Sequence, residues 1–286
     1  MAEEIIKETE NIRPDVLTAD DIIELVPRLS GHRRLVERLV RWTHLEDVNR
    51  YHRLVYDTPG PRAATRLIYE AFGSTMRVDN ADILDRLPEG AFITVSNHPF
   101  GAVDGIALIS LIGEKRPEFK VMVNMILNRI GALRPNFIAV DPLAQNDPAK
   151  KAVSINGIRA CLRQIKEGKP LGFFPAGAMS KTNRKGQLED RPWQDSVLQL
   201  IYRSNVPVVP VFFHGSNSRL FNFVGHVCWP LRSLMLPREV VRKCGSEVHV
   251  SIGEPISVEE QRPYRENAET LGRFLRERTY ALRNLK

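Results

Sequence analysis

Residues 91–113 read AFITVSNHPFGAVDGIALISLIG, and they pass from one kind of secondary structure to another within a short bend. The first seven residues form an apolar run typical of a buried strand, and the last thirteen are typical of a helix. Between the two runs lie His98, Pro99 and Phe100, with Asn97 ending the first run and Gly101 beginning the second. We therefore predict a strand, a tight turn and a helix in succession.

The same alternation of strands and helices continues toward the C-terminus. Apolar runs typical of buried strands occupy 119–124, 135–141, 169–175 and 206–213, and an alternating, edge-like run occupies 247–253. Helical spacing occupies 147–168, 193–204 and 258–285. In the first of these helices, Ile155, Ile158, Leu162 and Ile165 share one apolar face. The predicted fold class is α/β, with a central, mostly parallel or mixed sheet flanked by helices.

The first 80 residues show helical patterns instead of this alternation. We expect an N-terminal helical segment over residues 1–80 and an α/β domain over 81–286. Within residues 31–45, three apolar side chains lie at helical spacing against four arginines, a basic amphipathic pattern: Leu35, Leu39 and Trp42 against Arg33, Arg34, Arg38 and Arg41. This helix either packs its apolar stripe on the main domain or lies on a membrane surface.

Composition narrows the class of protein. Of the 286 residues, 43% are apolar and 26% are charged, as in an ordinary globular protein. The N-terminus lacks a secretion signal, no apolar run approaches the about 20 residues of a spanning helix, and the three cysteines (Cys161, Cys228 and Cys244) follow no zinc or disulfide pattern. We therefore expect a cytoplasmic protein that is soluble or rests on a membrane surface.

The net charge is +7, and the excess lies beyond the acidic N-terminus, because residues 26–286 hold 39 basic and 26 acidic residues. A basic body favours anionic lipid, an acidic protein or nucleic acid, although a solvated surface of high pI explains the same numbers. The basic residues are spread out and form no nucleic-acid module, so we predict no nucleic-acid partner.

His98 is the first candidate for chemistry. An imidazole accepts a proton near neutral pH, and a carboxylate on its other nitrogen fixes the tautomer. Asp104 reaches back to His98 if the chain turns sharply at Pro99–Gly101. The structural alternative is a capping histidine and an ordinary helix N-terminal aspartate. A second loop, FPAG at 174–177, follows another predicted strand, and its backbone N–H groups could stabilise an oxyanion.

Several other chemistries lack their motifs. The sequence contains no GxSxG, GxxxxGK[ST], GxGxxG or HExxH. Because no serine or cysteine nucleophile accompanies His98, we expect the imidazole to deprotonate a substrate hydroxyl directly. We expect no metal site and no redox cofactor.

Four segments, NHPFGAVDG, FIAVDP, FFPAGAMS and VPVVPVFFHG, occur in the order of the four motif blocks of the glycerolipid acyltransferase superfamily, the lysophosphatidic acid acyltransferase-like enzymes. Over residues 75–285 the chain resembles the hemolysin-like branch, which includes O-acyltransferases of ornithine and other aminoacyl lipids. The resemblance implies that His98 is the general base and that Asp104 orients it. It also implies acyl carrier protein or coenzyme A as the thioester carrier, with no cofactor beyond this co-substrate.

By position in the first and third blocks, the resemblance also implies residues that contact the substrates. They are Asn97, Pro99, Phe100, Gly101, Phe174, Pro175, Ala176, Gly177, Ser180 and Lys181.

The chain departs from the common pattern of the superfamily at informative places. Five residues separate His98 from Asp104, where four are usual, as suits the hemolysin-like branch. Ala176 and Met179 stand where Glu and Arg are usual, and Asp141 replaces an Arg. Because an Arg fork is the natural clamp for a phosphomonoester, these changes favour the hydroxyl of a lyso-aminolipid, of the N-acyl amino acid type, as acceptor.

Two alternative functions stay open. Lys181, Arg184 or Lys185 could supply a displaced phosphate site, which would make the protein a lysophospholipid/1-acylglycerol-3-phosphate acyltransferase. The second alternative is a catalytically silent lipid-binding protein on the same fold. Residues 220–243 mix large apolar side chains with arginines, and they either line an acyl tunnel and enter the bilayer interface or pack as a crossover.

We expect the lysolipid acceptor and acyl carrier protein as partners, with peripheral contact at the inner face of the cell membrane. His214, His226 and His249 lack acids at useful spacing, and we expect them to be structural.

Overall fold

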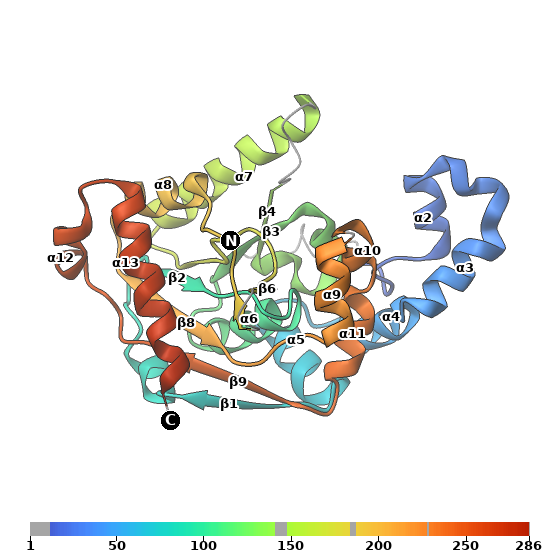
Figure 1. Cartoon of the computed structure of the whole chain (residues 1–286), viewed down its shortest axis with the longest axis horizontal. Coiled ribbons are helices and arrows are strands. Elements are labelled where there is room, and N and C mark those ends of the chain that lie inside the picture. Colours follow the sequence, from blue (N-terminus) through green and yellow to red (C-terminus); the bar gives the residue numbers. More distant parts are fainter. Residues whose placement is uncertain (1–11, 141–147, 184–186, 228, 286) are drawn as a thin grey trace.

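In the computed structural model, a seven-stranded sheet crosses the molecule with helices on both faces (Figure 1). The structure describes residues 12–140, 148–183, 187–227 and 229–285. The strands are β1 (Thr75–Asp79), β2 (Ile93–Ser96), β3 (Lys120–Asn124), β4 (Phe137–Val140), β5 (Leu171–Phe173), β8 (Val208–Phe213) and β9 (Glu247–Ile252), with β6 (Lys181–Thr182) and β7 (Leu188–Glu189) forming a separate hairpin.

The α-helices surround this sheet. They are α2 (Ala19–Leu25), α3 (Arg33–Trp42), α4 (Leu45–Arg53), α5 (Pro61–Arg66), α6 (Val103–Lys115), α7 (Pro148–Lys166), α8 (Asp195–Ser204), α9 (Arg219–Val227), α10 (Trp229–Leu234), α11 (Leu236–Lys243), α12 (Val258–Gln261) and α13 (Ala268–Ala281). Short 3-10 and π turns join them, namely η1 (Pro27–His32), η2 (Leu67–Ala71), η3 (Ala81–Arg86), η4 (Met125–Arg129), η5 (Gly131–Asn136), η7 (Arg262–Tyr264) and η8 (Leu282–Asn284).

The sheet order is β1-β9-β8-β2-β5-β3-β4. Strands β8, β2, β5, β3 and β4 pair in parallel, whereas β9 runs antiparallel to β8 and parallel to β1. The predicted α/β class with a mostly parallel sheet is therefore confirmed. Parallel strands end at the same edge of a sheet, so the loops that follow β2 and β5, which are neighbours, meet there.

Two expectations about the outer strands need correction. The run at 247–253 does not form the edge of the sheet, because β1 pairs along its outer side from Thr75↔Glu247 to Asp79↔Ser251. The same pairing means that residues 1–80 are not wholly helical. The short TMRVD run was missed because its partner lies far away in the sequence. The division into two domains stays a prediction.

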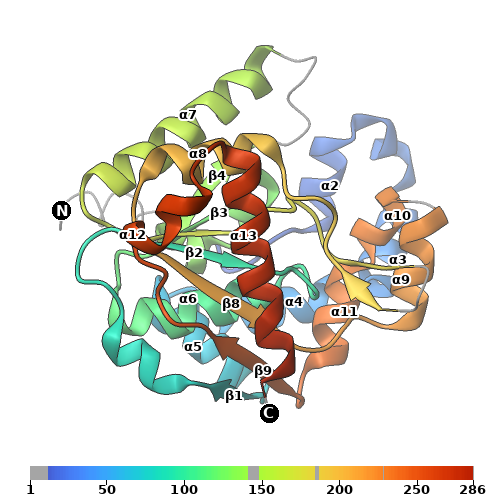
Figure 2. The ribbon, with the colours of Figure 1, turned by 60° about the vertical axis from the view of Figure 1, so that its left-hand side comes forward.

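Each face of the sheet has its own apolar core. On one face, α5 and α6 pack on alternate strand residues such as Val209, Val211 and Val250. On the other face, α7, α8 and α13 pack on Ile93, Val95 and other strand residues. Figure 2 shows α13 crossing in front of the sheet. Helices therefore pack on both faces of the strands whose carboxyl ends carry the candidate site.

Helix α7 packs with the face opposite to the one that its sequence favours. Ile155, Ile158 and Leu162 are exposed, and Ile165 is half-buried. Gly157 lies against β4 instead, where a Cβ would come within 2.5 Å of the Val140 side chain. The small residues on this face let the helix approach the strand closely, and that approach outweighs burial of the larger side chains.

Two further observations concern the expectations from composition. Within the described parts of the chain, no helix is long and apolar enough to cross a bilayer. Cys161 and Cys244 are free thiols, and Cys228 lies outside the described residues.

Candidate active site

The carboxylate of Asp104 organises the turn that follows β2. Its Oδ2 accepts hydrogen bonds from the N–H groups of Phe100 and Gly101, at 3.0 and 3.2 Å, and its Oδ1 accepts one from Gly105 at 3.0 Å. The side chain is fully buried in the first turn of α6. Gly101 has a φ of 86°, in the left-handed region that favours glycine. Asp104 therefore caps the turn at the start of α6, as the structural alternative predicted, and its carboxylate also faces His98.

The His98 ring lies between a carboxylate and an aromatic ring. Its Nδ1 is 3.0 Å from Asp104 Oδ2, although the ring N–H does not point straight at that oxygen. Catalytic hydrogen bonds of this kind are often poorly aligned without substrate. The ring stacks on Phe174, with centroids 4.1 Å apart and an angle of 29° between the planes. The side chain is 17% exposed, so Nε2 is the nitrogen left for a substrate.

The electrostatics of the pair match its geometry. Burial alone would lower the pKa of His98, but the Asp104 carboxylate outweighs burial and raises that pKa above its ordinary value. For Asp104, burial opposes ionisation, but His98 and the backbone N–H groups of Phe100 and Gly101 lower the pKa of the carboxyl. The aspartate is consequently ionised at neutral pH, and it stabilises an imidazolium that forms on His98.

The FPAGAMS loop closes over the turn from β5. The Ser180 N–H donates to the His98 carbonyl at 2.8 Å. The Met179 thioether occupies the space where a Gly101 side chain would stand. Asp190 holds both segments, because its Oδ1 accepts from the His98 N–H at 3.2 Å and from the Ser180 hydroxyl at 2.5 Å. The two loops that the sequence placed at strand ends are thus joined by hydrogen bonds.

The oxyanion donors expected from FPAG are partly engaged already. The Gly177 N–H donates to the Phe174 carbonyl at 2.9 Å, and Pro175 has no N–H. Gly177 itself is exposed with a φ of 61°, and a Cβ there would collide with the Gln194 side chain. The role of Gly177 in this structure is therefore to form the turn. Stabilisation of an oxyanion by this loop stays a prediction.

The other predicted substrate-binding residues divide into two groups. The Asn97 amide joins β2 to β8, since it donates to the Phe213 carbonyl at 2.9 Å and accepts from the Phe213 N–H at 2.7 Å. Buried residues shape the turn and the loop, namely Pro99, Phe100, Pro175 and Ala176, and Lys181 is half-buried. Substrate contact by any of these residues stays a prediction. Asp141, Arg184 and Lys185 lie outside the described residues.

A pocket of about 460 Å³ lies beside the turn. Asn217 lines it and donates from its amide to the Phe100 carbonyl at 3.1 Å, which ties the pocket wall to the His98 turn. The Oδ1 of Asn217 is buried without a partner among the described residues. The remaining lining residues are Thr182, Leu188, Ser216, Arg219, Asn222 and Phe223. This mixed lining suits a lipid that carries a polar headgroup.

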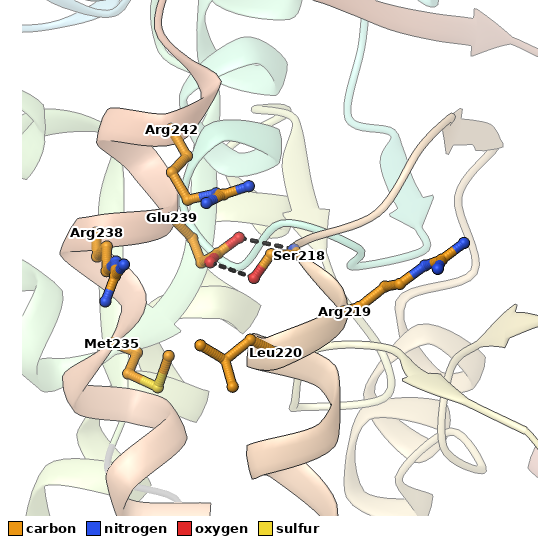
Figure 3. Close-up of a pocket in the computed structure, with 7 residues that line it drawn as sticks. All are labelled: Ser218, Arg219, Leu220, Met235, Arg238, Glu239 and Arg242. Carbon is orange, nitrogen blue, oxygen red and sulfur yellow. Dashed lines mark hydrogen bonds between the residues drawn. The ribbon is translucent and has the colours of Figure 1, made fainter.

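Figure 3 shows a second pocket, of about 320 Å³, between the start of α9 and α11. Glu239 is 2% exposed there, and it accepts from the Ser218 N–H and hydroxyl at 2.8 and 2.6 Å. Its lining residues are Ser218, Arg219, Leu220, Met235, Arg238, Glu239 and Arg242, so it lacks His98. Glu239 fastens the start of α9 to α11, and we assign the pair a structural role.

Sequence reasoning missed two residues at this site. Asp190 lies 92 positions from His98, and no local pattern connects them. Arg232 is 1% exposed and donates from Nη2 to the Ser180 carbonyl at 2.8 Å. The sequence did offer a signal for Arg232, because it is the single arginine in the largely apolar residues 220–236. A charged side chain in such a segment needs a hydrogen-bond partner if it is buried.

The expectation that His249 lacks an acidic partner is wrong, because Asp79 of β1 lies 2.6 Å from its Nε2. His214 binds the Ser251 hydroxyl at 2.8 Å and stacks on His249 with 12° between the ring planes. Ligand atoms of Asp79, His214 and His249 lie within 4.8 Å of one another. Parallel rings do not converge their lone pairs on one ion, however, so this group fits a hydrogen-bonded network better than a metal site. The side chain of His226 lies outside the described residues.

Comparison with known families identifies the chain. A family model described as "Acyltransferase" matches residues 19–286. The chain belongs to this acyltransferase family. The resemblance to the glycerolipid acyltransferase superfamily, which rested on four motif blocks, is thereby confirmed.

Two bacterial relatives match part of this acyltransferase. A lyso-glycine lipid O-acyltransferase of Bacteroides thetaiotaomicron is 27% identical over 181 residues, which is 60% of this chain and 64% of the relative. One of Phocaeicola vulgatus, with the same name, is 27% identical over 182 residues, 60% of this chain and 62% of the relative. The match thus spans less than two thirds of the relatives. The crystal structure of the 1-acyl-sn-glycerophosphate acyltransferase PlsC from Thermotoga maritima aligns with a TM-score of 0.47 at 15% identity, over 78% of this chain and 80% of that one.

Proposed function

We propose that this protein is an O-acyltransferase that moves a fatty acyl group from an acyl thioester to the hydroxyl of a lyso-aminolipid. The observation that carries the proposal is the buried Asp104 carboxylate 3.0 Å from His98 Nδ1, in a turn after β2 that is hydrogen-bonded to the loop after the neighbouring strand β5. This is the arrangement of a histidine base whose tautomer is held by an acid. Membership of the acyltransferase family supports the reaction class.

The reaction proceeds by direct attack. His98 Nε2 takes the proton of the acceptor hydroxyl as the oxygen bonds to the thioester carbonyl carbon. The tetrahedral intermediate collapses by breaking the carbon–sulfur bond, and His98 transfers its proton to the leaving sulfur, which restores the neutral imidazole. The products are an ester and a free thiol, so no covalent enzyme intermediate and no redox step are needed. The donor is acyl carrier protein or coenzyme A, and the basic surface suits either anion.

The acceptor is of the N-acyl amino acid type, with its free hydroxyl on the acyl chain. Ala176 and Met179 remove the charged side chains that a phosphomonoester acceptor requires of this loop. The two relatives named lyso-glycine lipid O-acyltransferase act, by their names, on a lysolipid with an amino acid headgroup. Both observations favour a carboxylate headgroup over a phosphate headgroup.

The enzyme meets its lipid substrate by peripheral contact with the inner face of the cell membrane. On α3, Leu35 and Trp42 are 59% and 45% exposed beside exposed arginines. On α9, Phe223 and Val227 are 65% and 74% exposed. Exposed aromatic and aliphatic side chains near arginines favour the headgroup region of an anionic bilayer. For residues 31–45 and 220–243, these exposed side chains favour contact with a membrane surface over packing on the main domain.

The test uses the purified full chain with acyl carrier protein or coenzyme A thioesters. The acceptors are a lyso-glycine lipid and lysophosphatidic acid, and diacyl product is measured by mass spectrometry. We expect product from the lyso-glycine lipid that disappears in His98→Ala, while binding to anionic vesicles persists. Equal rates with lysophosphatidic acid would contradict the proposed acceptor class. Vesicle binding without transfer to either acceptor would identify a silent lipid-binding protein.

A further inference from the structure

Arg232 is the largest fully buried side chain of the described structure, and it has no acidic partner there. Its Nη2 donates to the Ser180 carbonyl, and its Nε is buried without any acceptor among the described residues. A buried charge that lacks a counterion costs free energy, and burial accordingly lowers the pKa of this guanidinium to about 10.

The guanidinium of Arg232 is held between Phe221 and Gly225 of α9. It lies over the Phe221 ring, 4.8 Å from the centroid, in a cation–π contact. Gly225 leaves room for it, because a Cβ there would come within 2.5 Å of Arg232 Cδ and 2.9 Å of Nε. Helices α9 and α10 thus fix the position of the charge.

A single residue, Ser180, lies between the Arg232 guanidinium and His98. Ser180 links the two, since its carbonyl accepts from Arg232 while its N–H donates to the His98 carbonyl. The charge of Arg232 is also close enough to oppose protonation of His98. Asp190 does not neutralise Arg232, because its Oδ1 is bound by the Ser180 hydroxyl and the His98 N–H, with no contact to the guanidinium.

Two more cations are adjacent in sequence to residues of this hydrogen-bonded network. Lys181 follows Ser180 and Arg191 follows Asp190, and neither forms an ion pair with an acid of the described residues. Burial lowers the pKa of Lys181 first, and then Arg191 and Arg232 lower it further, as like charges close together do. Three cations therefore lie close to Ser180 and His98, and none of them forms an ion pair with an acid of the described residues.

We propose that Arg232, supported by Lys181 and Arg191, binds the free carboxylate of the amino acid headgroup of the acceptor and so selects the substrate. The inference rests on the proposed function. In an N-(3-hydroxyacyl) amino acid only a few bonds separate the hydroxyl from the carboxylate, which suits a cation one residue from His98. The phosphate of a pantetheine carrier has the same anionic chemistry, but the full length of the pantetheine arm separates it from the reacting sulfur.

The test compares two acceptors and two variants. The acceptors are N-(3-hydroxypalmitoyl)glycine and its glycinamide, which removes only the charge. The variants are Arg232→Met and, as a matched control, Arg273→Met on α13, where the arginine is exposed. We expect wild type to prefer the glycine acceptor. In R232M, the KM for the glycine acceptor should rise about 10- to 100-fold, and the KM for the glycinamide should change little. R273M keeps the preference of wild type.

Every other outcome overturns the proposal. A raised KM for the thioester with an intact preference for glycine would assign the anion to the donor phosphate. An equal loss of kcat with both acceptors would assign Arg232 a structural role. If circular dichroism shows that R232M does not fold, the double variant Lys181→Met/Arg191→Met is tested instead. Its preference for glycine over glycinamide then decides the question in the same way. Equal use of both acceptors by wild type would overturn the inference but leave the proposed function standing, whereas no transfer to either would overturn the function.

Discussion

The molecule contains two histidine–aspartate pairs that are built in opposite ways. His98 and Asp104 lie six positions apart on one turn, whereas His249 and Asp79 lie 170 positions apart on paired strands. Asp104 is fully buried and reaches Nδ1, so Nε2 of His98 is left for a substrate. Asp79 binds Nε2 of His249 and also accepts from the Ser251 hydroxyl. A carboxylate on an imidazole therefore fits the proposed general base only where, as at His98, the other ring nitrogen is left for a substrate.

Removing each imidazole gives the largest expected contrast between the pairs. His98→Ala should lower kcat/KM about 10²- to 10⁴-fold, because general base catalysis is lost. His249→Ala should leave kcat/KM within about threefold of wild type, since surface networks of this kind contribute mainly to stability. Steady-state transfer to a lyso-glycine lipid measures both. Comparable losses in the two variants would remove the distinction between the pairs.

Replacing the aspartates separates the pairs by their pH dependence. Asp104 raises the pKa of His98, so wild-type kcat/KM should fall as pH drops through that raised pKa, where the base becomes protonated. In Asp104→Asn, burial of His98 is no longer opposed, so the acidic limb should move to lower pH while the maximum falls about 10²-fold or more.

Asp79→Asn is the matched control for this experiment, and its pH profile should coincide with that of wild type. The profiles are measured as kcat/KM from pH 5 to pH 9. An Asp104→Asn limb that stays in place would show that another group sets it.

The turn that creates the local pair should be sensitive to one methyl group. Gly101→Ala places a Cβ in the left-handed region and against the Met179 thioether, and we expect it to lower the free energy of unfolding by about 2–4 kcal/mol. Gly245→Ala has a similar φ of 75° with nothing within 4 Å of its Cβ, so it should cost only about 1 kcal/mol. Urea unfolding measures both variants. If both variants lose the same free energy of unfolding, the Met179 side chain moves away from the new methyl group without cost.

The smallest effect concerns the distant pair. The side chains of His249 and Asp79 are 23% and 15% exposed, so Asp79→Asn should lower the free energy of unfolding by only about 1 kcal/mol. Thermal unfolding near neutral pH measures it, with transfer activity as the second readout. A loss of activity greater than the loss of folded protein would connect this network to the catalytic site.

Local patterns in the sequence predicted the features that depend on neighbouring residues. Apolar runs identified β2, β3, β4, β5, β8 and β9, and the punctuation at Pro99–Gly101 predicted the turn that brings Asp104 back. Features that depend on distant partners escaped. Nothing near Thr75 indicates that β9 will pair with it, and nothing near His98 indicates that Asp190 will bind its N–H. The buried face of α7 was missed because β4 selects small residues there.

The pairing of β1 with β9 has a consequence for synthesis on the ribosome. Thr75 pairs with Glu247, so the intervening residues 76–246 have to be translated before β1 can pair with β9. Until that moment the growing polypeptide carries an unpaired strand, a species that neighbouring nascent chains can capture. Strand β9 therefore covers β1 only after the intervening residues have been made, and slow translation near residue 247 would prolong the interval in which β1 is unpaired.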